Sequence, residues 1–102
     1  MKLLTKELEA RFPALYETEE KDAEEVKIIA KFFDPSGSWT WYATEYDAED
    51  RLFFGLVRGH EVEMGYFSLD ELQAVKGRLG LGIERDLHFG EHTLAEVLER
   101  SI

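Results

Sequence analysis

Residues 37–47 have the sequence Gly-Ser-Trp-Thr-Trp-Tyr-Ala-Thr-Glu-Tyr-Asp and hold both tryptophans and two of the four tyrosines of the chain. Aromatic and β-branched residues of this kind favour a β-strand. Successive side chains of a strand point to opposite faces, so Trp39 and Trp41 are expected together on one face. Tyr42 and Tyr46 are expected on the other. We expect the tryptophan face to be core and the tyrosine face to be accessible surface.

Three further segments carry strand signals, and turn residues join them. Residues 26–33 and 52–57 are rich in β-branched and aromatic residues, and residues 61–64 alternate polar with apolar. Residues 34–37, Asp-Pro-Ser-Gly, match the preferences of a type I turn. Four consecutive strands joined by short loops predict an antiparallel meander.

Helix signals flank this meander. Thr5 is expected to cap a short first helix, Ser68 to start a second that ends near Gly77, and Thr93 to start a third. Residues 83–89 lie between glycines and predict a possible fifth strand.

At 102 residues the chain is expected to form a single domain with one core. An antiparallel sheet must cover its apolar face, and the helices are the available cover. The predicted fold class is therefore α+β: a four-stranded antiparallel meander with a possible fifth strand, covered by two or three short helices. The face expected under the helices carries Val26, Ile28, Trp39, Trp41, Phe54, Leu56, Met64 and Tyr66. The opposite face is expected to carry Lys31, Phe33, Tyr42, Tyr46, Phe53 and Glu63.

The formal net charge is −10, from 22 acidic and 12 basic residues. Half of it lies in residues 17–25, where six carboxylates face one lysine. Such a charge argues against nucleic-acid binding, which needs clustered Lys and Arg. We expect the run to be a solvated loop.

Composition also bears on where the protein works. The chain has no cysteine, which fits a reducing compartment and leaves no thiolate for catalysis or metal binding. No apolar run approaches the roughly 20 residues that a membrane span requires. We expect a cytoplasmic protein that does not enter membranes, as a monomer or a weak dimer.

One group of residues has the chemistry of a metal site. In an extended strand Glu84, Asp86 and His88 would lie side by side and could hold a divalent ion or transfer a proton. The alternative is that they are ordinary surface charges of an edge strand. No cofactor is predicted.

The tyrosine face is the predicted binding site. It consists of Tyr42, Tyr46 and Phe53, with the carboxylates Glu45 and Asp47 at the far end of the strand. Tyrosine-rich patches are typical of the centres of protein interfaces. The alternative is that a third layer covers these rings.

The sequence therefore suggests three candidate functions. The first is a noncatalytic module that binds a protein partner through the tyrosine face. The second is an acidic mimic of DNA charge, an antirestriction-like inhibitor. The third is a small metal-dependent enzyme that uses Glu84, Asp86 and His88.

Several motifs together resemble a known family of small bacterial proteins that is described only as a domain of unknown function. The motifs are Leu-Leu-Thr at residues 3–5, Phe-Phe-x-Pro-x-Gly-Ser-Trp-Thr-Trp-Tyr at 32–42, Phe-Phe-Gly-Leu-Val at 53–57, Gly-Tyr-Phe-Ser at 65–68 and Ile-Glu-Arg-Asp-Leu-His-Phe at 83–89. Members of that family often occur on plasmids and mobile elements. The resemblance implies a cytoplasmic accessory role in such elements, and it implies no catalytic activity.

Overall fold

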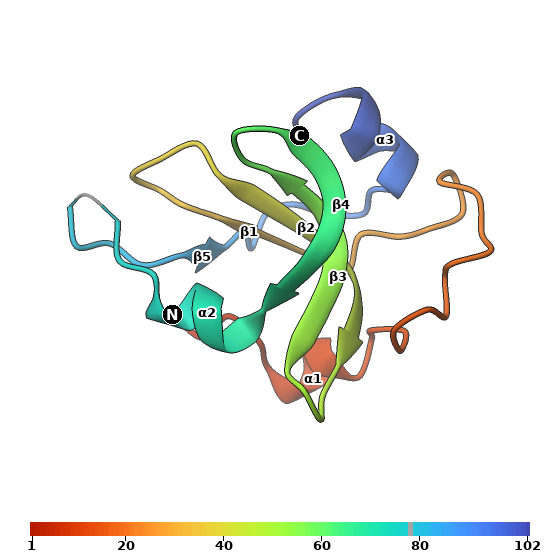
Figure 1. The fold of residues 1–102 in the computed structure, drawn as a ribbon, viewed down its shortest axis with the longest axis horizontal. Coiled ribbons are helices and arrows are strands. Elements are labelled where there is room, and N and C mark those ends of the chain that lie inside the picture. Colours follow the sequence, from red (N-terminus) through yellow and green to blue (C-terminus); the bar gives the residue numbers. More distant parts are fainter. Residues whose placement is uncertain (78) are drawn as a thin grey trace.

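The computed structural model describes residues 1–77 and 79–102. Its centre is a five-stranded antiparallel sheet in the order β4-β3-β2-β1-β5 (Figure 1). The strands are β1 (Ala30–Phe33), β2 (Thr40–Asp47), β3 (Leu52–Arg58), β4 (Val62–Ser68) and β5 (Glu84–Arg85). The helices are α1 (Lys6–Glu9), α2 (Leu69–Ala74) and α3 (Leu94–Glu99). The structure confirms the α+β class and the meander from β1 to β4, and the possible fifth strand adds to the far side of β1.

The turn between β1 and β2 forms as its sequence predicts. The Asp34 carboxylate accepts hydrogen bonds from the Ser36 backbone and hydroxyl, both at 2.9 Å. The Gly37 N–H donates to the Asp34 carbonyl at 3.2 Å, and the Asp34 N–H donates to the Trp39 carbonyl at 3.0 Å. This turn aligns β2 beside β1.

The three predicted N-caps are confirmed. The Thr5, Ser68 and Thr93 side chains accept hydrogen bonds from the backbone N–H groups of Leu8, Glu71 and Glu96.

The predicted end of α2 is wrong, because the helix stops at Ala74 and not near Gly77. Gly77 is needed for close approach: a Cβ at this position would lie 1.9 Å from the Ser36 hydroxyl oxygen. The left-handed backbone falls at Gly80, with φ 74°.

Both faces of the sheet are covered, each by a different part of the chain. The first core cluster joins one face to the N-terminal segment, α2 and Ile83, and it consists of Leu3, Leu4, Ala30, Phe32, Trp41, Ala43, Tyr46, Phe53, Phe67, Leu69, Leu72 and Ile83. The second cluster joins the other face to α3, and it consists of Ile28, Tyr42, Leu56 and Val97. In Figure 1, α1 and α2 lie along the lower side of the view and α3 lies at the upper right.

A β-bulge in β2 changes which side chains share a face. Ala43 pairs with Gly55 and Glu45 pairs with Phe54, so Thr44 is an extra residue in β2. An extra residue reverses the alternation beyond it. Tyr46 therefore joins the first cluster and Tyr42 the second, and the prediction that they share a face is wrong.

The predicted pairing of faces is also wrong between β2 and β3. Trp41 was expected on the face of Phe54 and Leu56, but it pairs with Val57. A register that differs by one residue moves every side chain of a strand to the opposite face. Leu56, Met64 and Tyr66 consequently lie on the face of Tyr42.

Two further core assignments differ from expectation. Ile28 lies in the second cluster although Ala30 lies in the first, because β1 starts only at Ala30 and the Ile29 N–H already donates to Ala43. Trp39 precedes β2 and is 37% exposed, with its ring 6.0 Å from that of Trp41.

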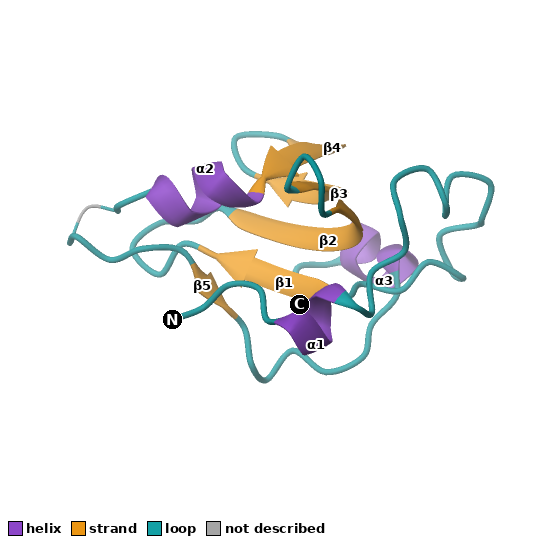
Figure 2. Cartoon of the chain, turned by 90° about the horizontal axis from the view of Figure 1, so that it is seen from below, coloured by secondary structure: helices purple, strands orange, loops and turns teal. Residues whose placement is uncertain are grey.

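The acidic segment 17–25 belongs to the loop between α1 and β1, which projects from the body beside α3 (Figure 2). Its six carboxylate residues are all exposed, as expected for a solvated loop. Within the described residues, no helix is long and apolar enough to cross a membrane.

Candidate binding surface

The predicted tyrosine face is buried, so it is not the accessible surface expected from the sequence. Tyr42 and Phe53 are fully buried and Tyr46 is nearly so. The rings of Tyr46 and Phe53 lie 4.6 Å apart within the first cluster. Burial raises the pKa of the Tyr46 phenol. These three residues therefore stabilise the core.

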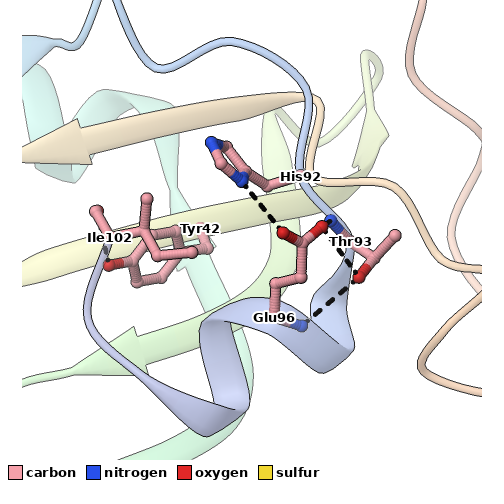
Figure 3. Close-up of polar contacts among 5 residues, drawn as sticks. All are labelled: Tyr42, His92, Thr93, Glu96 and Ile102. Carbon is pink, nitrogen blue, oxygen red and sulfur yellow. Dashed lines mark hydrogen bonds and ion pairs between the residues drawn. The ribbon is translucent and has the colours of Figure 1, made fainter.

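The region around α3 closes the second face over Tyr42 (Figure 3). The Tyr42 hydroxyl donates to the Ile102 backbone oxygen at 3.2 Å, and the Tyr42 ring lies 5.9 Å from that of Phe89.

Glu96 fixes the start of α3 through a reciprocal pair of hydrogen bonds with Thr93. The Thr93 N–H donates to the Glu96 carboxylate at 3.0 Å, and the Glu96 N–H donates to the Thr93 hydroxyl oxygen at 3.3 Å (Figure 3). The other carboxylate oxygen lies 3.3 Å from Nδ1 of His92. The bond from the Thr93 backbone, followed by that from His92, lowers the pKa of Glu96. This arrangement is a helix cap.

Glu45 has a role that the sequence did not reveal. Its side chain is on the face of Leu56, only 3% of the residue is exposed, and its carboxylate reaches the projecting loop. The carboxylate accepts hydrogen bonds from the Tyr16 N–H and the Thr18 N–H, each at 2.9 Å, and from the Thr18 hydroxyl. Glu45 therefore fastens the loop to the bulge of β2.

The attachment of the loop to Glu45 has two unusual features. Tyr16 has φ 71°, in the left-handed region that residues other than glycine seldom adopt. Among the described residues, no ion pair involves the Glu45 carboxylate. A buried carboxylate is ordinarily paired with a cation, and here three neutral donors surround it.

Asp47, the remaining predicted binding residue, ends β2. Its carboxylate accepts a hydrogen bond from the Glu49 N–H at 3.1 Å, which shapes the turn into β3.

The predicted metal set does not assemble. β5 ends at Arg85, so the strand alternation that would align Glu84, Asp86 and His88 stops too early. Asp86 instead lies 3.4 Å from the Lys31 ammonium and accepts a hydrogen bond from the His88 N–H at 2.9 Å. Nowhere in residues 1–77 and 79–102 do three His, Asp or Glu side chains form a group that could hold a metal ion.

One exposed apolar surface lies on β4 and the neighbouring loop. Val62, Met64 and Tyr66 are 51%, 37% and 50% exposed, and Tyr16 of the loop is 63% exposed. We call these four residues the β4 patch. The sequence showed the alternation of residues 61–64, but the expected register placed its apolar side under a helix.

The outer edge of β4 is open, since β4 is the last strand of the sheet and no other described strand pairs with it. Two hydrogen bonds at the ends of β4 show which of its residues direct their backbone groups toward β3. The Gly59 N–H donates to the Glu61 carbonyl, and the Leu69 N–H donates to the Arg51 carbonyl. Odd-numbered residues of β4 direct their backbone toward β3, so Val62, Met64 and Tyr66 direct N–H and C=O outward. A Cβ added at Gly65 would have no neighbouring atom within 4 Å.

A pocket of about 270 Å³ lies between the loop and the sheet, beside the β4 patch. We call it the loop pocket. Its walls include the three rings of Tyr16, Phe54 and Tyr66 and the three charged side chains of Glu19, Lys21 and Glu45. A hydrogen bond to the Tyr16 phenol, with partial burial and the nearby Glu45 and Glu19, raises the pKa of Tyr66.

A larger hollow of about 720 Å³ lies on the other side of the molecule, between α1 and the residues that follow β5. Three cationic and three acidic side chains line it: Arg11, Lys31, Arg85, Glu7, Asp86 and Glu91. Lys31 and Asp86 already pair with each other. Its charges balance, unlike those of the loop pocket.

Comparison with known proteins identifies the family. Residues 3–100 match the model of DUF2958, a family described as proteins of unknown function. No curated protein and no solved structure matches the chain. Because the match covers nearly the whole chain, the protein belongs to the DUF2958 family.

Proposed function

We propose that the protein is a noncatalytic module that binds a protein partner, and that an extended segment of the partner adds to the free edge of β4. The open backbone of this seven-residue strand is the observation that carries the proposal. Extended segments bind such edges through main-chain hydrogen bonds, and side-chain pockets supply specificity. The β4 patch provides apolar contact beside that backbone.

Charge defines the partner. Glu19 and Glu45 line the pocket beside the β4 patch against Lys21 alone, and the six carboxylates of residues 17–25 are all exposed on the acidic loop. A second copy would bring another net charge of −10 to this surface, and like charges oppose association. A basic segment has the complementary charge.

The setting that accompanies this proposal is the cytoplasm of a bacterium, with an accessory role on mobile elements. The family resemblance supports that setting, and the lack of cysteine agrees with it.

One observation favours a second function, the mimicry of DNA charge. All six carboxylates of residues 17–25 are exposed on a projecting loop. If this loop imitates phosphates, replacing the six residues by Asn or Gln abolishes inhibition of a DNA-binding enzyme. Under the leading proposal the same variant still pairs its partner with β4, with a slower association rate.

Met64→Pro tests the leading proposal. Proline removes the outward N–H of Met64 and leaves the ladder to β3 intact, whereas Met64→Leu keeps the N–H and the apolar side chain. A partner is captured with the tagged protein, purified and titrated by calorimetry. Met64→Pro is expected to weaken binding at least about tenfold, because a lost edge contact of about 1.4 kcal/mol has that effect.

Circular dichroism and thermal unfolding establish that both variants fold. Equal affinity of the folded Met64→Pro and Met64→Leu proteins for the partner would rule out pairing through the β4 edge.

A further inference from the structure

We propose that the loop pocket binds the guanidinium group of one arginine side chain of the partner. This inference rests on the proposed function and names the residue by which the partner is recognised. It is carried by the size, the aromatic walls and the charge of the pocket.

The size of the pocket fits a side chain. Its volume of about 270 Å³ lies just below the roughly 300–1,000 Å³ of sites that take drug-sized ligands. It is therefore large enough for one long side chain and too small for most complete cofactors.

The aromatic walls suit a flat cation. The Phe54 and Tyr66 rings lie 4.9 Å apart at 56°, and Tyr16 approaches from the loop. Arginine stacks on aromatic faces within about 6 Å and is more weakly hydrated than an ammonium group. A planar guanidinium is accordingly favoured over the compact ammonium of lysine.

The charge of the pocket points the same way. Glu45 is buried, and no described cation pairs with it. A carboxylate has about four acceptor positions, and three hydrogen bonds are made here. An arginine would supply both the missing donor and the missing positive charge, and Glu19 at the rim adds a second carboxylate.

Lys21 also lines the pocket and opposes a bound cation. Its side chain is exposed, so solvent screens its charge. The two carboxylates still outnumber it, and its removal is expected to tighten binding.

The position of the pocket agrees with strand addition at β4. Met64 and Tyr66 line the pocket, and their backbone groups point to the open edge. Alternate side chains of an added strand lie on the same face as these two residues. An arginine at one such position would reach the pocket while its own backbone pairs with β4.

The experiment is an NMR titration of the whole chain with N-acetyl-arginine methylamide. The matched control is N-acetyl-citrulline methylamide, which has nearly the same shape without the charge. We expect saturable shifts at the amides of Tyr16, Thr18, Phe54 and Tyr66 with the arginine amide and none with the citrulline amide.

Variants sharpen the test. Glu19→Gln and Tyr66→Leu should each weaken binding about threefold to tenfold, and Lys21→Gln should strengthen it about twofold or more. Glu63→Gln makes the same charge change on the other face of β4 and should leave the affinity unchanged. Since Glu45→Gln also loosens the loop, the exposed Glu19 gives the cleaner measurement.

Equal shifts with the arginine and citrulline amides would overturn the inference, as would equal affinities of Glu19→Gln and Glu63→Gln. Tighter binding of N-acetyl-lysine methylamide would overturn the choice of guanidinium. If no arginine response occurs but Met64→Pro still prevents partner binding, the pocket inference fails and the proposed function stands.

Discussion

The two edge strands of the sheet are built differently. β5 has two residues, both charged, and the Arg85 guanidinium donates to the carbonyls of Lys2 and Leu3 at 3.1 and 3.0 Å. β4 has seven residues and exposes Val62, Met64 and Tyr66 along its free edge. Natural sheets protect their edges with short, charged or covered strands, as at β5.

The difference shows where to look for a function. Charged side chains near β5 make contacts within the chain, as the Lys31–Asp86 pair shows. The β4 side leaves backbone groups, apolar side chains and a carboxylate without a cationic partner in the described structure. The proposed strand addition rests on this open edge of seven residues.

The largest expected effect is the loss of stability when the Phe53 ring is removed from the core beneath β4. Phe53 is fully buried, and its ring lies 5.3 to 5.5 Å from Phe12, Phe32 and Phe67. Phe53→Ala should reduce the free energy of unfolding by about 3–5 kcal/mol, measured by urea denaturation. Tyr66→Leu removes an exposed ring next to β3 and should leave the urea midpoint almost unchanged. Similar losses in the two variants would contradict the division between core and patch.

The next effect concerns the loop that contributes Tyr16 to the β4 side. Glu45→Gln replaces an acceptor-only carboxylate with an amide, whose NH₂ group must face either the Tyr16 N–H or the two donors of Thr18. Hydrogen bonds to charged groups contribute about 1.5–3 kcal/mol, so loop docking should weaken by about 2 kcal/mol.

Hydrogen exchange at the Tyr16 and Thr18 amides measures this weakening. Glu49→Gln makes the same charge change at an exposed turn and should leave exchange at both amides as it is. Unchanged protection in Glu45→Gln would show that the loop is held by other contacts.

A smaller effect is expected at the protected edge. Arg85→Ala removes two hydrogen bonds to the N-terminal segment, and we expect about 1–2 kcal/mol less stability in chemical denaturation. Faster exchange at the Phe33 amide, which faces β5, should accompany the loss. If Arg85→Ala changes neither quantity, the protection of β5 does not depend on this side chain.

The smallest expected effect is a change in the pKa of Tyr66. The pKa of Tyr66 is raised above its ordinary value of about 10, first by the Tyr16 hydrogen bond. Because the folded-state pKa of Tyr66 is raised, the contribution of its neutral phenol to loop docking is fully present below about pH 10. That contribution is lost as the pH rises through the folded-state pKa. Tyr16→Phe should bring the Tyr66 pKa down toward its ordinary value in an ultraviolet titration. An unchanged Tyr66 pKa would place the cause elsewhere.

The parts of the fold that depend on nearby residues were predictable. Thr5, Ser68 and Thr93 cap helices through bonds to residues three positions away, and the Asp34 turn closes within four residues. Such signals are local, so the helix starts and the meander follow from the sequence.

The candidate site depends on distant contacts, and the sequence misplaced it. No local signal marks the extra residue Thr44, yet this bulge separates Tyr42 from Tyr46 and directs Glu45 to residues 27 and 29 positions away. The open side of β4 likewise depends on a register that one residue reverses. A glutamate within an aromatic strand was the available hint, since a buried carboxylate must find partners.

Gly65 gives a practical route to this edge. Side-chain space is open at this position, on the face of β4 away from the loop pocket, and the chain has no cysteine of its own. Gly65→Cys would therefore introduce a single thiol at the middle of the open strand without displacing a neighbour. A fluorophore or spin label attached there would report the arrival of a partner strand directly, in the intact protein.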